Sequence, residues 1–323
     1  MRFPRSLGLL GIYVGSQLVA LALAIPFLRL GYQTTANPGA VTNILPYLLV
    51  IVLAPLAILF LADRAPHRLA LLRYLLLGSI AFALVYTMDG VFGLLLPTPF
   101  GTMVGVSVDP VLTAAFVVAE VCFLLLLMEP QWYVVDTVGF LAAGSLITLL
   151  GISLGILPAL LLLGALMVYD AVAVYGTRHM IALADVVTDL KLPILLVMPT
   201  QGGFDYTQGG SLRDHRKVVR QDPTQREAVF MGLGDVIIPG ILVVSSFVFL
   251  PSRPWFGGIP SNLAVSLAVL AGSLVGYGAL MGRVNRGNPQ AGLPFLNGGA
   301  MVGYVLAYLA IYHSWGLGLS FTL

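Results

Sequence analysis

Two aspartates lie in apolar stretches of this sequence and could do acid–base chemistry together. Asp170 stands in "LMVYDAVAVYGT" and Asp235 in "MGLGDVIIPGIL". Two neighbouring carboxyls in an apolar setting do not readily ionise together, so the pair holds one proton over a wide pH range. The ionised carboxyl can then take a proton from water while the protonated one hydrogen-bonds a scissile carbonyl. Such chemistry requires no metal ion and no cofactor, and we expect neither. Alternatively, each carboxyl only hydrogen-bonds a neighbouring helix.

The residues around Asp235 favour an active role. Gly232 and Gly234 remove the side chains on its flank, so another backbone could approach the carboxyl closely. Pro239 has no N–H for the carbonyl four positions back, so we expect the helix to kink or open there. Open backbone at membrane depth is tolerated where it lines a water-filled cavity.

The composition is that of an integral, multi-pass membrane protein. Hydrophobic residues make up 59% of the chain and charged residues 9%, with a mean hydropathy of +0.97. A soluble domain carries about 25% charged residues. We expect the cell membrane if the source is prokaryotic, with membrane lipid as a partner. The net charge of +2 and the lack of a phosphate-binding loop give no indication of nucleic acid.

Nine segments are apolar enough over about twenty residues to span a bilayer. They are 8–30, 41–62, 69–95, 110–128, 134–150, 153–176, 228–250, 263–282 and 291–313. The fifth and sixth are divided only at "GISLG". We therefore predict an all-α polytopic membrane protein with nine transmembrane helices. A five-helix N-terminal scaffold, 1–152, would precede a catalytic part, 153–323, that contains one long loop, 177–227.

The distribution of basic residues predicts the orientation. With nine spans, fourteen of the sixteen Lys and Arg residues fall on one side, and only Arg29 and Arg253 on the other. Basic residues concentrate in cytoplasmic loops. The N-terminus and the long loop are therefore predicted to be cytoplasmic and the C-terminus outside.

Depth distinguishes the two aspartates from the other acids in the predicted spans. Asp170 lies about six residues, or roughly 9 Å, from the cytoplasmic end of its span, and Asp235 about seven residues, or roughly 10 Å, from the same boundary. Consecutive helices are often neighbours, so the two carboxyls could face each other. Asp89 and Asp136 lie near span ends and are interpreted as interfacial. Glu120 lies mid-span, and we expect an interhelical hydrogen bond or an accessory proton site.

The two stretches resemble the presenilin and signal peptide peptidase family of intramembrane aspartyl proteases. That family carries Tyr-Asp on its sixth span and Gly-x-Gly-Asp on its seventh, which here read Tyr169-Asp170 and Gly232-Leu233-Gly234-Asp235. The resemblance implies that Asp170 and Asp235 are catalytic. It covers most of the chain in topology and mainly 165–300 in sequence.

A third family motif, Pro-Ala-Leu, is altered in this sequence. The stretch Ala291-Gly292-Leu293-Pro294 is similar to the family's Pro-Ala-Leu-Pro, with the first proline lost and the alanine reduced to glycine. In the family this segment packs beside the catalytic pair and shapes the place where substrate lies. We therefore expect Ala291 to Pro294 near Asp170 and Asp235. Alternatively, the segment is an ordinary helix start.

The resemblance implies a presenilin-like fold and cleavage of single-span transmembrane or signal-peptide-like substrates in the bilayer, with no obligate protein partner indicated. The unwound substrate would pair as a strand beside the Gly-x-Gly-Asp helix, with 192–197 and 227–230 as candidate partners. The apolar spacing in 180–190 predicts an interfacial helix. Substrates with an outside N-terminus would follow from the predicted orientation.

Two other functions remain open on the sequence. Prepilin-type peptidases also combine Gly-x-Gly-Asp with a second aspartate and trim leader peptides at the membrane face. An ion-coupled transporter or channel would use Asp170, Asp235 and Glu120 as coupling sites, but transporters usually show two related halves, which we do not find.

Overall fold

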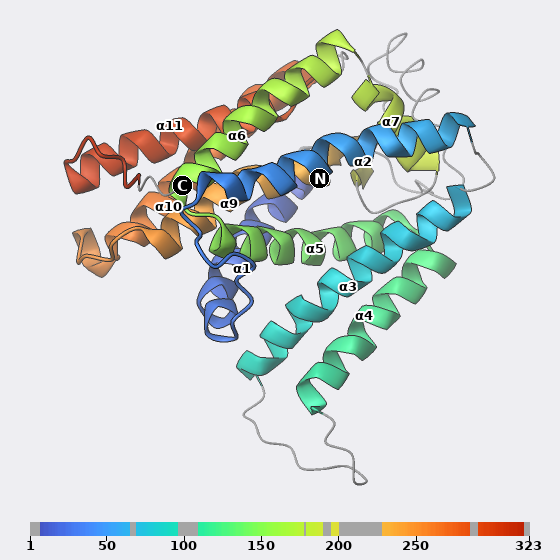
Figure 1. Cartoon of the computed structure of the whole chain (residues 1–323), viewed down its shortest axis with the longest axis horizontal. Coiled ribbons are helices and arrows are strands. Elements are labelled where there is room, and N and C mark those ends of the chain that lie inside the picture. Colours follow the sequence, from blue (N-terminus) through green and yellow to red (C-terminus); the bar gives the residue numbers. More distant parts are fainter. Residues whose placement is uncertain are drawn as a thin grey trace, which may run out of the picture.

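The computed structural model describes residues 7–64, 69–95, 109–177, 179–189, 195–199, 228–284 and 290–319. The described chain is a bundle of long helices with one short pair of strands (Figure 1). Most of the predicted loop 177–227 lies outside the described residues.

The first part of the chain forms five long helices. They are α1 (Leu7–Arg29), α2 (Ile44–Arg64), α3 (Leu69–Leu95), α4 (Pro110–Met128) and α5 (Trp132–Ser153). The start of α4 has favourable capping residues. The N-cap Asp109 accepts a hydrogen bond from the Val111 N–H through its side chain. Pro110 follows at the first helical position, where an N–H would have no partner within the helix. α5 ends at Ser153, so the predicted division from the sixth segment is confirmed.

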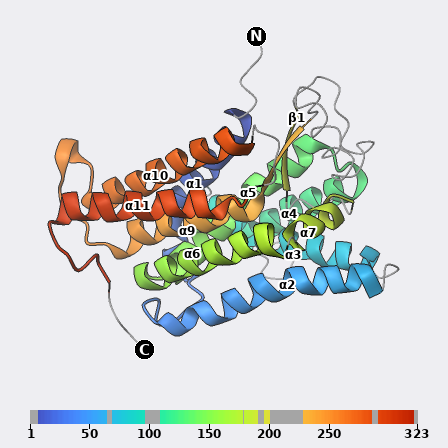
Figure 2. The same cartoon turned by 90° about the horizontal axis from the view of Figure 1, so that it is seen from above.

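The second part of the chain contains shorter elements before its last helices. They are α6 (Ile156–Ala171), the π-helix η3 (Val172–Gly176), α7 (His179–Asp189), β1 (Leu195–Pro199), β2 (Ala228–Gly232), α9 (Leu233–Phe249), α10 (Ser261–Val284) and α11 (Leu293–Tyr312). α7 confirms a helix over 180–189; Leu190 lies outside the described residues, and the interfacial position of this helix stays a prediction. β1 and α7 lie together at one end of the helix array (Figure 2).

Eight helices in the described part of the chain are long and apolar enough to cross a membrane. α6 reaches that length together with η3, as the segment Ile156–Gly176. The remaining predicted span corresponds to α9, which is apolar but only 17 residues long. The chain is a mostly helical, multi-pass membrane protein, and the count of nine spans and the orientation stay predictions.

The start of the seventh span was predicted wrongly. Residues Ala228–Gly232 form a strand rather than the first turn and a half of a helix, so Asp235 lies in the first turn of α9. Val229 and Phe230 favour extended backbone, which an apolar count does not register. α9 continues as helix through Pro239, so the helix does not open there, and the alternative that was predicted, a kink, is not tested.

The two strands pair antiparallel, with Leu195 opposite Gly232, Val197 opposite Phe230 and Pro199 opposite Ala228. β1 packs against α5, α1 and α7, whereas β2 contacts mainly β1 and α9. β2 continues without a loop into α9. The pair therefore connects the N-terminal helices to the start of the helix that carries Asp235.

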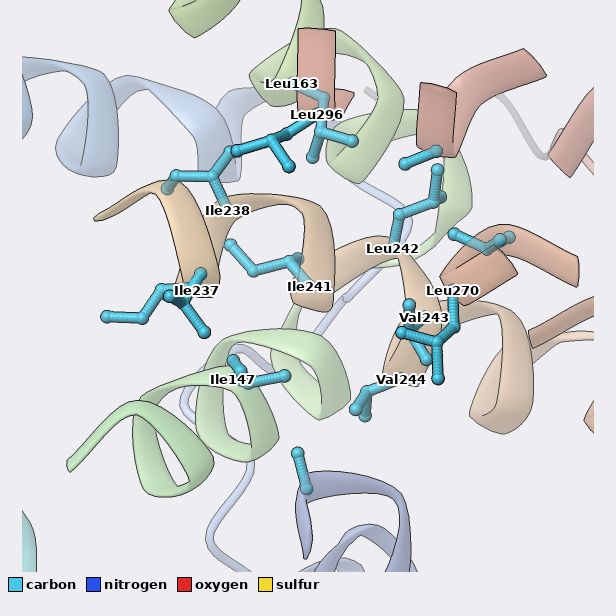
Figure 3. Packing of buried hydrophobic residues seen from close by; sticks show 14 of the residues in the cluster. Ile147, Leu163, Ile237, Ile238, Ile241, Leu242, Val243, Val244, Leu270 and Leu296 are labelled. Carbon is cyan, nitrogen blue, oxygen red and sulfur yellow. The ribbon is translucent and has the colours of Figure 1, made fainter. Parts of the chain in front are cut away.

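α9 is the centre of the core. Every residue from Val236 to Ser246 is buried, as expected for a helix that is apolar all round and surrounded by other helices. Figure 3 shows Ile147 of α5 on one side of α9, and Leu163 of α6 with Leu296 of α11 on the opposite side, next to Ile238. α1 and α5, from the predicted scaffold, thus pack with helices of the predicted catalytic part.

The α10–α11 pair approaches through glycines. A Cβ built on Gly272 would collide with the carbonyl oxygen of Gly299, and one built on Gly276 with the carbonyl oxygen of Phe295. Small residues let transmembrane helices meet backbone to backbone. This contact fixes the position of α11 closely against α10.

α3 and α4 form a separate pair that diverges from the rest of the bundle (Figure 1). Their shared cluster includes Leu77, Leu84 and Ala115, and much of the remaining surface of both helices is exposed. Near the far end of α3, the Tyr32 hydroxyl donates to Asp89. Burial and the neighbouring Asp89 carboxyl both raise the pKa of Tyr32, which therefore stays neutral.

Candidate active site

Asp170 lies at the end of α6, as the last residue but one of that helix. Its side chain is buried, and its Oδ2 accepts a hydrogen bond from the backbone N–H of Leu293 at 3.0 Å. The start of α11 therefore holds Asp170 through a main-chain donor.

Asp235 lies near a helix N-terminus, in the first turn of α9, whereas Asp170 lies near a helix C-terminus. Gly232 caps that helix in an extended conformation, and its backbone N–H donates to the Asp235 carboxyl. A carboxyl three residues after the cap that bonds back to the cap N–H is one half of a capping box. The partial positive charge of the helix start also favours an acidic group here. The strand-to-helix junction thus fixes the position of the carboxyl.

The two carboxyls converge on the same segment. A Cβ built on Gly292 would lie 2.6 Å from Asp235 Oδ2 and 2.7 Å from Oδ1, so the Asp235 carboxyl occupies the space beside that glycine. The next residue, Leu293, donates to Asp170. The two carboxyls also interact electrostatically with each other. The carboxyls of Asp170 and Asp235, which are 65 positions apart in sequence, therefore lie beside two consecutive residues at the start of α11.

The predicted third motif thus lies where it was expected, beside both aspartates. Ala291 and Leu293 are buried, and Pro294 stands in the first turn of α11, where it needs no hydrogen-bond partner. From the sequence, the small residues of this segment are expected to preserve a close approach, and Gly292 is where the structure shows it. Only a residue without Cβ leaves room for the Asp235 carboxyl in this arrangement.

Among the described residues, no atom outside its own helix and neighbours lies within 4 Å of the place where a Cβ of Gly234 would be. The space beside Gly234 is open, so the approach of another backbone there stays a prediction. Within the described chain, the close approach to the Asp235 carboxyl is made at Gly292. Tyr169, beside Asp170, bonds through its hydroxyl to His179 Nε2 at 3.0 Å, and Thr177 bonds to the other ring nitrogen at 2.6 Å.

Tyr175 is a site residue that sequence reasoning missed. Its hydroxyl donates to Gln290 Oε1 at 3.0 Å and accepts from the N–H of Ala291 at 3.2 Å. In a regular α-helix, a residue five positions after Asp170 would point about 140° away from it. The π-helix η3 changes that direction, and such turns are frequent at functional sites. The five-residue spacing between Asp170 and Tyr175 therefore does not predict the contact of Tyr175 with Ala291.

The other intramembrane acids do not join the pair. Asp136 lies near the start of α5, and its interfacial depth stays a prediction; its side chain is buried within the protein, and its Oδ1 accepts from the N–H of Val197 at 2.7 Å. Asp89 bonds to Tyr32. Glu120 is exposed on the outer side of α4 and so does not make the interhelical contact expected of it within the described residues.

The comparisons with known proteins agree with this geometry. The family described as "Signal-peptide peptidase, presenilin aspartyl protease" matches residues 10–312. The chain belongs to this family. No curated protein sequence matches it significantly. The match supports neither a prepilin-type peptidase nor a transporter.

Two solved structures described as a presenilin family intramembrane aspartate protease are similar to the chain. One, in space group C222, shares 30% sequence identity, with a TM-score of 0.63 over 94% of this chain and 98% of the other. The second, in space group P2, shares 29% identity, with a TM-score of 0.62 over 96% of this chain and all of the other. The chain therefore has the presenilin-like fold and is an aspartic endopeptidase of the membrane, acting on membrane-protein substrates.

Proposed function

We propose that the protein hydrolyses peptide bonds within or near single-span transmembrane helices, and that Asp170 and Asp235 are its catalytic residues. One observation carries this proposal: both carboxyls contact the Gly292–Leu293 segment, although they come from different helices. A pair of carboxyls in this setting shares one proton, which provides a base and an acid in one site.

In the proposed reaction, the ionised carboxyl takes a proton from water as the water oxygen bonds to the scissile carbonyl carbon. The protonated carboxyl hydrogen-bonds the carbonyl oxygen and transfers its proton to it. When the tetrahedral intermediate collapses, the C–N bond breaks and the leaving nitrogen takes a proton from the dyad, while the intermediate returns one. The products are a carboxylic acid and an amine, and the dyad again holds one proton.

The substrate helix must be unwound before this reaction, because helical carbonyls are hydrogen-bonded and shielded. The β1–β2 pair supports a specific place for the unwound segment. β2 leads directly into α9, and Asp235 follows its last residue by three positions. A substrate strand added along this pair would run past the catalytic carboxyls. The residues that shape this place are Tyr169, Gly232, Leu233, Gly234, Ala291, Gly292, Leu293 and Pro294.

The test uses the full chain reconstituted in phosphatidylcholine vesicles with a labelled single-span peptide of about twenty apolar residues. Asp170→Asn and Asp235→Asn should each abolish cleavage, by at least about 10³-fold, since neither leaves a titratable pair. Glu120→Gln, on the outer side of α4, is the matched control and should cleave normally. Full activity in either aspartate variant would rule out the dyad.

We also propose that the N-terminus and the 177–227 loop are cytoplasmic, on the basis of the Lys and Arg distribution. Substrates would then be spans with an outside N-terminus. Trypsin added to sealed right-side-out vesicles should leave the basic stretch 213–220 intact, and the same protease should cut it in inverted vesicles. Cleavage in right-side-out vesicles would reverse the orientation.

A further inference from the structure

Asp136 is a buried carboxyl that the proposed reaction does not use. It lies in the second turn of α5 and is only 5% exposed. Its Oδ1 accepts a hydrogen bond from the backbone N–H of Val197 in β1, at 2.7 Å. Its Oδ2 is buried and has no hydrogen-bond partner among the described residues. A buried carboxyl oxygen without a hydrogen bond lowers the stability of the fold, so Asp136 is a candidate for a functional role.

The register of the strand pair shows which edge of β1 this bond occupies. Opposite residues in an antiparallel pair alternate between hydrogen-bonded and non-hydrogen-bonded positions. Pro199 has no N–H, so the pair that it forms with Ala228 is non-hydrogen-bonded. Val197 lies two residues away and has the same parity. Its N–H therefore points away from β2, toward α5, where Asp136 accepts it.

The outer edge of β1 is thus closed to another strand. Its central donor is used by Asp136, its last residue is a proline without a donor, and the strand packs against α5. Free strand edges accept further strands, and proteins close an edge with proline, with charged side chains or with a covering helix. β1 carries all three of these features. Within the described residues, this edge of β1 therefore has no free donor at its centre.

We propose that Asp136 is a positioning residue for proteolysis. It docks β1 on α5 and closes the outer edge of β1 to an unwound substrate segment. This role rests on the proposed function, because it concerns how that substrate is held. The bond also ties the strand pair to a helix that packs directly on α9, which keeps β2 in a fixed register relative to Asp235.

Three variants separate this role from a general contribution to stability. Asp136→Asn keeps an oxygen acceptor for Val197, Asp136→Leu is similar in size but has none, and Thr137→Val is the matched control. Thr137 is the next residue of α5, is exposed and bonds only to its own helix, at the Tyr133 carbonyl. The measurements are KM, kcat and the cut positions, determined by mass spectrometry, for the labelled single-span peptide in phosphatidylcholine vesicles.

Asp136→Leu should raise KM about tenfold and spread the cuts over several neighbouring bonds, because the strand pair no longer holds the substrate in one register. Asp136→Asn and Thr137→Val should keep the wild-type KM and cut positions. A substitution that only destabilises the protein lowers the active fraction, which reduces the apparent kcat but changes neither KM nor the cut positions. Wild-type KM and cut positions in Asp136→Leu would overturn the proposal, as would an equal effect in Asp136→Asn.

Val197→Pro tests the same bond from its other end if Asp136→Leu does not fold. It removes the N–H while keeping a residue type that β1 already accommodates at Pro199. The same rise in KM and spread of cuts are expected, and a wild-type profile would overturn the proposal. The proposed function is tested separately, because it fails if Asp235→Asn retains cleavage, whatever the Asp136 variants do.

Discussion

The α10–α11 pair and the α3–α4 pair are built differently. α10 and α11 meet through glycines, and a Cβ at Gly272 or Gly276 would collide with the backbone of α11. α3 and α4 meet through side chains such as Leu84 and Ala115, and a Cβ at Gly78 of α3 would meet nothing within 4 Å in the described part of the chain. Backbone contacts leave little freedom for two helices to shift, whereas side chains can repack.

The difference follows from what each pair positions. The first residues of α11 supply the main-chain donor for Asp170 and the space for the Asp235 carboxyl. A displacement of about 1 Å at such a site can reduce the rate about 10²-fold. α3 and α4 carry neither aspartate and present much of their surface outward. The packing is therefore most rigid where the proposed chemistry needs a fixed geometry.

The largest effect is expected from a methyl group added between α10 and α11. Gly272→Ala should destabilise the protein by about 3 kcal/mol, because backbone atoms must move to admit the Cβ. Gly278→Ala, on the same helix, meets nothing within 4 Å among the described residues and should leave the melting temperature unchanged or slightly raised. Thermal unfolding in detergent measures both. Equal stability of the two variants would remove the distinction between the helix pairs.

Gly292→Ala should act on the rate rather than on the fold. The added Cβ would meet the flexible Asp235 carboxyl, which can rotate away, so we expect a normal melting temperature and a kcat lowered about 10²-fold. The substitution restores the alanine of the family motif, which makes the prediction specific to this chain. Gly298→Ala, in open space on α11, is the control. Unchanged cleavage in Gly292→Ala would contradict the described position of Asp235.

Tyr175→Phe should have a smaller effect on the same site. It removes the hydroxyl that binds Gln290 and the Ala291 N–H, and so loosens the segment that leads into α11. A fivefold to tenfold fall in kcat is expected, which corresponds to about 1 kcal/mol for the lost bonds. Tyr133→Phe, at an exposed position on α5, should cleave as the wild type does. Equal kcat values for Tyr175→Phe and Tyr133→Phe would show that the hydrogen bonds of the Tyr175 hydroxyl contribute nothing to catalysis.

The smallest effect is expected on the outer surface of α4. Phe116 is 53% exposed, so Phe116→Leu should change the free energy of unfolding by less than about 0.5 kcal/mol. Ile241→Val, in the fully buried centre of α9, removes one methylene and should cost about 1 kcal/mol. A larger loss from Phe116→Leu would mean that α4 has a packing role that its exposure does not indicate.

The apolar pattern was enough to predict the helices and the approach of Asp170 to Asp235, because long apolar runs and intramembrane acids are strong local signals. It failed at Ala228–Gly232, where five apolar or small residues fit a strand as well as a helix. It also did not predict the contact of Asp136 with β1, since nothing in the sequence near Asp136 reveals that β1 lies against it.

The geometry of the site depends on contacts between distant segments. The role of Gly292 follows from the side chain of Asp235, 57 positions earlier, and the role of Tyr175 from a π-helix that has no clear sequence signature. Local propensity and periodicity describe one segment at a time, so they cannot specify such contacts. The resemblance to the family correctly indicated the neighbourhood of Ala291 to Pro294, but it did not indicate that the Asp235 carboxyl makes the close approach at Gly292.

The most direct test of the central claim is the proximity of residues 170 and 235 in the folded protein. Cys122 is the only cysteine, so Asp170→Cys and Asp235→Cys can be combined on a Cys122→Ser background without competing thiols. A short thiol crosslinker in phosphatidylcholine vesicles should join the two new cysteines rapidly, and should not join Cys at 170 with Cys at 120. Crosslinking of the 170/235 pair no faster than that of the 170/120 pair would contradict the account.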